Sequence, residues 1–122
     1  MHELSIARSV VDEVAAAAFA RGFAWVSSVR LEVGSLCGVI DGALEFAFEL
    51  AAAGTPLEGA CLEIVRTPVR LWCPTCLKVV QPAEDAMFVC PDCGNSCGEL
   101  VSGRELVICA FVGQVSAAAA AE

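Results

Sequence analysis

The sequence predicts an α+β fold in which two helices pack on a three-stranded mixed sheet, with a cysteine-rich module inserted between two strands. Three observations support this prediction: a helical spacing of apolar residues near the amino terminus, later stretches of β-forming residues, and two Cys-Pro-x-Cys pairs. A chain of 122 residues is long enough for one such domain and a small module, so two units are the limit.

The two helices are expected before and after the first strand. Residues 4 to 20 place apolar side chains on one stripe and charged ones elsewhere, and Gly22 ends this helix. Asp41 can cap a second helix that runs to Gly54, where a Thr-Pro pair prevents continuation. Apolar residues surround much of this second helix, so we expect it to be heavily buried. The stripe of the first helix consists of Leu4, Ala7, Val11, Val14 and Ala18, with Ile6 and Val10 beside it.

Three segments have the composition of strands. Residues 29 to 33 alternate between apolar and charged side chains, which is typical of a half-buried strand. A second strand is expected at about residues 61 to 67. Residues 105 to 112 form the richest β stretch of the chain, and we expect them to return to the main sheet.

The segment between the second and third strands is then an insertion. We expect residues 1–68 and 104–116 to form the main α+β domain and residues 69–103 to form the inserted module. Residues 117–122 form an alanine-rich tail to which we assign no function.

The inserted segment contains four cysteines at metal-ligand spacing. Cys73 and Cys76 form one Cys-Pro-x-Cys pair and Cys90 and Cys93 the other, with thirteen residues between the pairs. A short hairpin can bring these thiolates around one tetrahedral ion, and zinc favours that ligand set. Four protein ligands leave no position for a substrate, so we interpret the site as structural Zn(II) in a zinc-ribbon-like module. So short a segment cannot bury enough apolar surface to fold without the metal.

Other interpretations of the cysteines remain open at this point. Two disulfides, unpaired core cysteines or an iron site would also use the two pairs. Cys61 and Cys109 lie in expected strands, and we interpret them as small core residues. Cys97 could replace a zinc ligand, although Cys93 completes the better spacing. Cys37 follows the first strand and is interpreted as a surface or half-buried thiol.

Charge and hydropathy exclude several classes of protein. Seven basic residues against 15 acidic ones give a net charge of −8, which would repel nucleic acid. No apolar stretch approaches the length of a membrane span, and no secretory signal opens the chain. We therefore expect a protein of the reducing cytoplasm whose partners are proteins or cations.

The amino terminus offers a second metal-binding arrangement. The chain begins Met1-His2-Glu3, and His2 is its only histidine. The Met1 amine, the His2 amide nitrogen and the His2 ring Nδ1 can close adjoining chelate rings around one cation, with Glu3 as a fourth donor. A metal that displaces an amide proton and accepts a planar nitrogen set is required, which indicates Ni(II) or Cu(II). A histidine at this position is more often part of a frayed terminus.

Taken together, these motifs resemble the HypA/HybF hydrogenase maturation proteins. The resemblance covers the chain to about Val115, and its most specific feature is the pairing of the Met-His-Glu opening with the late cysteine tetrad. The residues that carry it are Met1-His2-Glu3-Leu4-Ser5, Val29-Arg30-Leu31-Glu32-Val33-Gly34, Leu44-Glu45-Phe46-Ala47-Phe48-Glu49 and the two Cys-Pro-x-Cys pairs.

The resemblance implies a nickel metallochaperone and not an enzyme. His2 would be the principal Ni(II) ligand, with Met1 and Glu3 beside it, and an acidic residue at the place of Asp41 sometimes assists. The protein would deliver its nickel cargo to the large subunit of a [NiFe]-hydrogenase together with the family's nickel-loading GTPase. Two other functions stay open: a zinc-ribbon protein–protein adaptor with an inert His2, and a thiol redox enzyme that uses one Cys-Pro-x-Cys pair.

Overall fold

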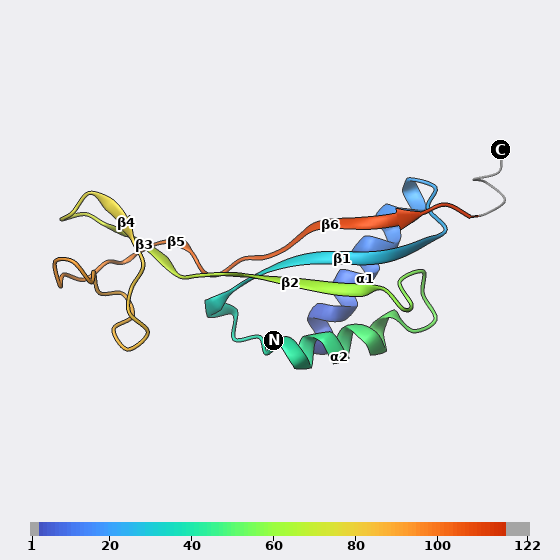
Figure 1. The fold of residues 1–122 in the computed structure, drawn as a ribbon, viewed down its shortest axis with the longest axis horizontal. Helices are drawn as coiled ribbons and strands as arrows, with labels where there is room; N and C mark the ends of the chain where they lie inside the picture. Colours follow the sequence, from blue (N-terminus) through green and yellow to red (C-terminus); the bar gives the residue numbers. More distant parts are fainter. Residues whose placement is uncertain (1–2, 117–122) are drawn as a thin grey trace. The chain divides into compact units, whose positions relative to one another are not determined.

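The computed structural model describes residues 3–116 of the chain (Figure 1). They divide into two units: residues up to Leu31 with Val39–Val65 and the chain from Val107, and Glu32–Gly38 with Arg66–Leu106. Among these residues no helix is long and apolar enough to cross a bilayer. The elements are α1 (Glu3–Ala20), β1 (Trp25–Gly34), the 3-10 helix η1 (Ser35–Cys37), α2 (Asp41–Ala52), β2 (Cys61–Thr67), β3 (Arg70–Cys73), β4 (Lys78–Val80), β5 (Glu99–Ser102) and β6 (Leu106–Gln114).

The main sheet has the strand order β2-β1-β6. Hydrogen bonds at the two ends of β1 show that it runs antiparallel to β6. Just before β1, the amide of Ala24 donates to the carbonyl oxygen of Gln114 at the end of β6, at 2.7 Å. At the end of β1, the amide of Gly34 donates to the carbonyl oxygen of Glu105, just before β6. The Arg30–Glu63 ion pair joins β1 to β2, which runs parallel to it in Figure 1. The predicted mixed three-stranded sheet is therefore confirmed.

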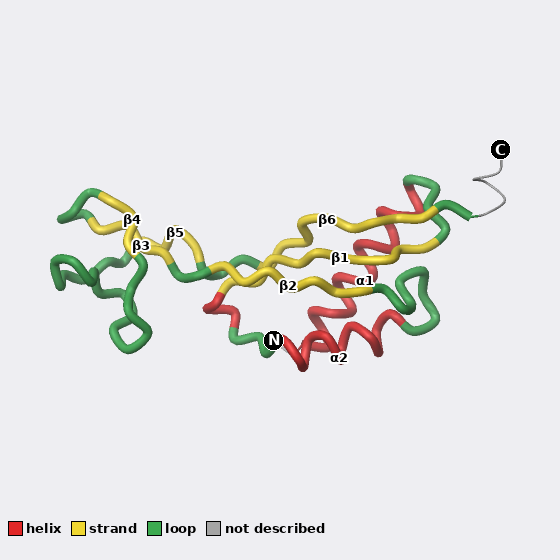
Figure 2. The backbone as a smooth tube through the Cα atoms, viewed as in Figure 1, coloured by secondary structure: helices red, strands yellow, loops and turns green. Residues whose placement is uncertain are grey.

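Two helices pack with this sheet in the first unit (Figure 2). The stripe predicted for α1 is buried from Ile6 to Ala18, but Leu4 at its end is exposed. Every second residue of the predicted strand, Val29, Leu31 and Val33, is almost completely buried. The alternation therefore predicted the buried face of the strand, with Val29 and Leu31 in the first unit and Val33 in the part of β1 that belongs to the second.

The second helix differs from its prediction in two respects. Asp41 is its first helical residue and not its cap: the cap position is Ile40, in an extended conformation and without a side-chain cap hydrogen bond. The expected heavy burial is also wrong, because Phe46 is 63% and Leu50 is 56% exposed. Only the side facing α1 and the sheet is covered, so apolar identity alone misled the burial prediction. The buried residues of α2 are Leu44, Ala47, Phe48 and Ala52.

The second unit is built on a small antiparallel sheet of strand order β4-β3-β5. Its core is short of aliphatic side chains and contains three cysteine side chains in their place. A core of this size supplies little hydrophobic stabilisation, so we expect a bound metal to contribute much of the stability of this unit. The buried residues are Val69, Leu71, Cys73, Val80, Cys90 and Cys97.

The end of β1 and the following turn also belong to the second unit. Gly34 lies so close to the Gly103 backbone that a Cβ at Gly34 would approach its carbonyl carbon to 2.2 Å. The amide of Leu36 donates to the carbonyl oxygen of Gly103 at 2.7 Å, and Ser35 Oγ donates to that of Thr67 at 3.0 Å. Only glycine permits this backbone approach at position 34.

Candidate metal centre

Two similar turns place the four predicted zinc ligands. In the first, β3 ends at Cys73, whose carbonyl oxygen accepts a hydrogen bond from the Leu77 amide at 2.8 Å. In the second, the carbonyl oxygen of Cys90 accepts one from the Gly94 amide at 2.9 Å. Both donors have a positive φ, 55° at Leu77 and 76° at Gly94. A positive φ is strained for leucine, so the first pair adopts the same turn around its sulfur atoms although it has no glycine at that position.

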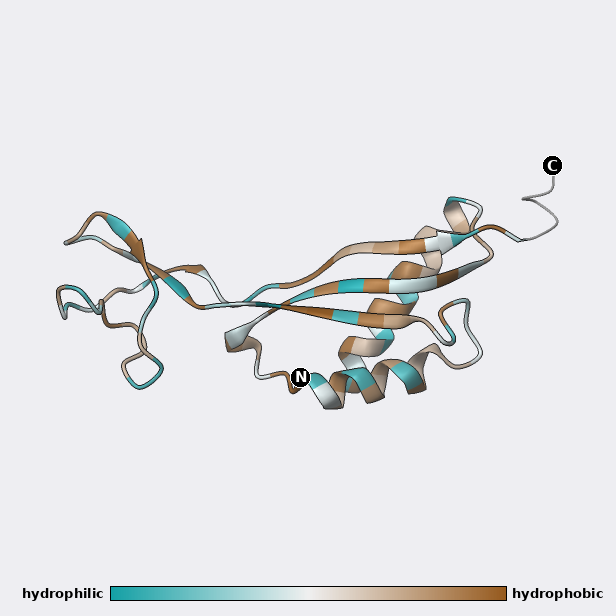
Figure 3. Cartoon of the chain, in the orientation of Figure 1, coloured by the Kyte–Doolittle hydropathy of each residue, from teal (hydrophilic) through white to brown (hydrophobic). Residues whose placement is uncertain are grey.

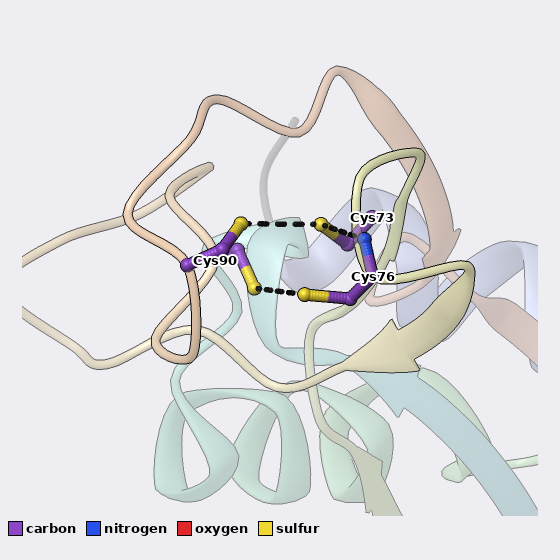
Figure 4. Close-up of side chains that lie close together, drawn as sticks. Cys73, Cys76 and Cys90 are labelled. Carbon is purple, nitrogen blue, oxygen red and sulfur yellow. Dashed lines mark hydrogen bonds between the residues drawn. The ribbon is translucent and has the colours of Figure 1, made fainter.

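The geometry of the four sulfur atoms fits one tetrahedral zinc ion. All four lie within 4.8 Å of one another, with Cys73 and Cys93 3.6 Å apart and Cys76 and Cys90 3.9 Å apart (Figure 4). Zinc–sulfur bonds of about 2.3 Å in a tetrahedron place the sulfurs about 3.8 Å from each other. A disulfide would need sulfurs about 2.05 Å apart, so the two-disulfide interpretation does not describe this structure.

Hydrogen bonds and burial give these thiols different pKa values. The Cys76 amide, 3.4 Å from the Cys73 sulfur, lowers the pKa of Cys73 to about 6, against the effect of burial. A hydrogen bond with Cys93, helped by burial, raises the pKa of Cys76 to about 12. For Cys93 the Asn95 amide lowers the pKa, but burial and the neighbouring thiols outweigh it and the pKa is raised. Joint ionisation of the set therefore needs a bound cation.

Two polar contacts outside the sulfur cluster join the two cysteine-containing turns, which we call knuckles. Lys78, which follows the first pair, forms an ion pair with Asp92 inside the second pair. Asn95 Nδ2 donates to Thr75 Oγ1 at 3.1 Å. These partners hold the two turns in register beside the metal position, as outer contacts of metal sites commonly do. In the sequence, Lys78 lies two residues after Cys76 and Asp92 directly before Cys93, and this proximity to the ligands was the available signal for the contact.

The other four cysteines are not part of this cluster. Cys97 is fully buried beside it. Burial is the main cause that raises the pKa of Cys97 to about 11, and the neighbouring Cys73 thiol is the next. Cys37 is half-buried, as predicted, with its sulfur 3.1 Å from the Glu105 carbonyl oxygen.

The prediction that Cys61 and Cys109 are core residues is wrong, because both are exposed. They lie in β2 and β6, the two edge strands of the main sheet, where side chains have fewer neighbours. In β2 exposed and partly buried positions alternate, so Cys61 and Glu63 lie on the same exposed face. The charge of Glu63 was therefore a signal that Cys61 is exposed.

The predicted nickel site is only partly within the described residues. Met1 and His2 lie outside them. Glu3 is the first residue of α1, and its Oε2 accepts a hydrogen bond from the Ile40 amide at 3.4 Å. This contact places the start of α1 next to the start of α2, where Asp41 follows Ile40 in the chain. Two acidic residues, Glu3 and Asp41, thus lie in the first turns of the two helices.

The α+β domain and the Cys₄ centre define a protein with a structural metal site closed to substrates. Residues 1–112 match the family model described as hydrogenase/urease nickel incorporation metallochaperone, HypA. The Hydrogenase maturation factor HypA of Chloroflexus aggregans is 46% identical over 111 residues, 91% of this chain and 97% of the relative. That of Streptomyces avermitilis is 46% identical over 109 residues, 88% of this chain and 83% of the relative. The chain therefore belongs to the HypA family of metallochaperones, which are maturation factors and not enzymes.

Solved structures show the same fold. The solution structure of the Ni metallochaperone HypA from Helicobacter pylori matches with a TM-score of 0.67 and 23% identity, over 95% of this chain and 100% of that one. A second solution structure of a HypA protein matches with a TM-score of 0.71 and 22% identity, over 95% of this chain and 98% of that one. The α+β fold with a zinc-ribbon-like module is thus confirmed.

Proposed function

We propose that this protein binds one Ni(II) at its amino terminus and delivers it to the large subunit of a [NiFe]-hydrogenase in the cytoplasm, together with a nickel-loading GTPase. The observation that carries the proposal is the Met1-His2-Glu3 opening on a chain whose family incorporates nickel. Relatives at 46% identity are named hydrogenase maturation factors, which favours a hydrogenase over urease as the recipient. Residues 1–68 and 104–116 would form the nickel-binding domain, and residues 69–103 the zinc module.

The chelate that we propose uses the Met1 amine, the His2 amide nitrogen and the His2 imidazole, with the Glu3 carboxylate beside them. Two adjoining chelate rings give a planar nitrogen set, which suits Ni(II). Copper binds such nitrogen ligands more tightly than nickel does, so nickel selection would depend on metal supply and on docking with the right partner. An open terminal site also allows release to a second protein.

Two features of the described residues support a cation at this position. The Glu3 carboxylate is directed to the start of α2 by its contact with the Ile40 amide. Asp41 adds a second carboxylate next to that contact, and the chain as a whole carries a net charge of −8. These charges favour binding of a divalent cation through space.

Nickel binding should depend on pH in a defined direction. The amine and the imidazole must lose their protons to bind metal, and the reference pKa of histidine is about 6.5. As pH falls, protons compete with Ni(II) and the metal is released. In this proposal the zinc centre does not itself bind the nickel, since its four ligand positions are filled by protein.

A calorimetric titration of Ni(II) into the zinc-loaded, tag-free protein tests the proposal. The native chain, His2→Ala and a chain extended by one residue at the amino terminus would be compared. We expect one nickel per native chain, and loss of binding in both altered proteins, because each removes part of the chelate. Equal binding in all three proteins, or no binding in any, would contradict the terminal site. In that case a zinc-ribbon adaptor that binds only other proteins becomes the better function.

The assignment of partners needs a separate test. Nickel transfer from the loaded native protein to a purified hydrogenase large-subunit precursor, with and without the GTPase, can be followed by metal analysis of the separated proteins. The proposal expects transfer that requires His2 and is faster with the GTPase. Transfer that is unchanged in His2→Ala would show that the recipient takes its nickel from another source.

A further inference from the structure

The core of the second unit contains a fifth thiol beside the four zinc ligands. Between Pro91 and Glu99, all within the described chain, Cys97 is the one buried residue. Its exposed fraction is 0%, and it lies in the same core cluster as the ligands Cys73 and Cys90. Figure 3 shows short stretches of strongly apolar colour in this unit, separated by pale and teal ones. In a core this small each buried position matters, and this one carries a group that can bind metal.

Backbone pairing holds Cys97 on the side of the metal position. The Cys97 amide donates to the Phe88 carbonyl oxygen at 2.8 Å, and the Cys90 amide donates to that of Asn95 at 2.9 Å. Asn95 and Cys97 are two residues apart on this paired segment, so their side chains project to the same face. The Asn95 side chain reaches the first knuckle, where its Nδ2 lies 3.1 Å from Thr75 Oγ1. The Cys97 thiol is therefore directed to the region between the two knuckles, where the ligand sulfurs lie.

The zinc ligand nearest to Cys97 in the sequence is the one most open to solvent. Cys73 and Cys90 are buried and Cys76 is half-buried, whereas Cys93 is exposed. A thiolate at the surface is the one that oxidants and alkylating reagents reach first. Cys97 follows Cys93 by four residues and belongs to the same knuckle. The vulnerable ligand and the protected fifth thiol are thus parts of one short turn.

We propose that Cys97 is a reserve zinc ligand, which takes the position of Cys93 when that thiolate is lost from the site. Before such a loss Cys93 is the fourth ligand, because its sulfur lies within 4.8 Å of those of the other three ligands and Cys97 lies outside that set. The site would then keep four thiolates while Cys93 is modified or engaged elsewhere. This inference does not depend on nickel binding at the amino terminus.

The exchange fits the geometry of the second knuckle. Asn95 is the backbone partner of Cys90, so Cys97 is a diagonal neighbour of Cys90 across the paired segment. Such neighbours lie about 7–8 Å apart, and somewhat less between their Cβ atoms. Zinc–sulfur bonds of about 2.3 Å allow two thiols at this separation to bind one ion after a small rotation. Cys97 gives up its thiol proton as its sulfur binds, and a released Cys93 thiolate takes a proton from solvent, so no oxidant or reductant is required.

The competing interpretation is that Cys97 is a small apolar core residue, which is a common role of buried cysteine. It predicts that Cys97→Ala affects packing alone, with the same effect on metal binding whether Cys93 is present or not. The reserve-ligand proposal predicts that the effect of Cys97→Ala on metal binding is large only when Cys93 is absent. A double-mutant comparison therefore separates the two interpretations, whatever the packing cost of the substitution is.

The first test is the absorption spectrum of the full chain with Co(II) in place of zinc. Sulfur-to-cobalt charge-transfer absorption increases with the number of bound thiolates, so native, Cys97→Ala and Cys93→Ser proteins should all show the four-thiolate spectrum. Cys93→Ser/Cys97→Ala should keep about three quarters of that absorption and bind zinc at least about tenfold more weakly than Cys93→Ser. Cys93→Ser/Cys37→Ala is the matched control and should equal Cys93→Ser, since Cys37 is a half-buried thiol of the same unit outside the cluster.

The second test keeps all four ligands native and treats the zinc-loaded protein with N-ethylmaleimide. A colorimetric chelator reports released zinc, and mass spectrometry identifies each modified cysteine. The native chain should retain zinc after Cys93 has reacted, whereas Cys97→Ala should release zinc as Cys93 reacts.

Several results would overturn the proposal. Equal spectra and zinc affinities for Cys93→Ser and Cys93→Ser/Cys97→Ala would assign Cys97 to packing alone. A Cys93→Ser chain that binds no metal would show that the fifth thiol is unable to complete the site. A three-thiolate spectrum for Cys97→Ala alone would make Cys97 a ligand of the native site and not a reserve. Equal zinc release from the native and Cys97→Ala chains during the maleimide reaction would also contradict it.

Discussion

Leu71 gives the sharpest test of how the second unit is stabilised. It is fully buried in the small core beside three cysteine side chains, so Leu71→Ala removes apolar volume where little else is present. Large-to-small substitutions at such sites cost about 2–5 kcal/mol. Because a metal-dependent module folds as it binds zinc, this loss should appear in the zinc affinity. At about 1.4 kcal/mol per tenfold change, we expect zinc to bind roughly 30- to 3000-fold more weakly.

The assay is a competition titration of the zinc-loaded protein against a chelator of known affinity. Val79→Ala is the control, since Val79 lies on the adjacent strand β4 but is 47% exposed, and its zinc affinity should change little. The refuting result is an equal zinc affinity for Leu71→Ala and the native protein. Such a result would mean that the second unit is folded without metal, and that zinc binds to a preformed site.

Three further predictions concern protons, a backbone contact and a buried thiol. Zinc binding near pH 7 should release at least the protons of Cys76 and Cys93, whose pKa values are raised, so affinity should increase with pH; calorimetry in buffers of different ionisation enthalpy measures this. Gly34→Ala should lower the thermal stability by about 2 kcal/mol or more, whereas Gly42→Ala, with no atom near its new Cβ, should be neutral or stabilising. Iodoacetamide should modify the exposed thiols well before Cys97, and mass spectrometry of the zinc-loaded protein would detect the reverse order.

The zinc ligands were predictable because their chemistry is local. Two Cys-Pro-x-Cys pairs form similar turns whatever the rest of the fold does, and the spacing of the pairs limits how they meet. The helices were predictable for a related reason, since the apolar stripe of α1 repeats over several turns. The positive φ of Gly22 just after α1 also agrees with the predicted helix end.

Burial at the edges could not be predicted from residue type. Cys61 and Cys109 resemble core residues in the sequence, but whether a strand is central or at an edge is decided by segments distant in the chain. The same reasoning applies to Phe46 and Leu50 on the exposed side of α2. The β1 strand begins at Trp25, earlier than predicted, because Ser27 and its neighbour interrupt the apolar alternation without ending the pairing.

The loop between the two knuckles, residues 81–87, lies outside the contacts that close each knuckle. The first knuckle is closed by the pairing of Cys73 with Lys78, and the second by a bridge between Val89 and Ser96. Neither closure involves residues 81–87, and doubling the length of a flexible loop costs only about 0.6 kcal/mol. Peptide tags or fluorescent-label sequences inserted into this loop should therefore leave the zinc centre intact. The loop offers a place to attach a reporter that keeps the amino terminus native.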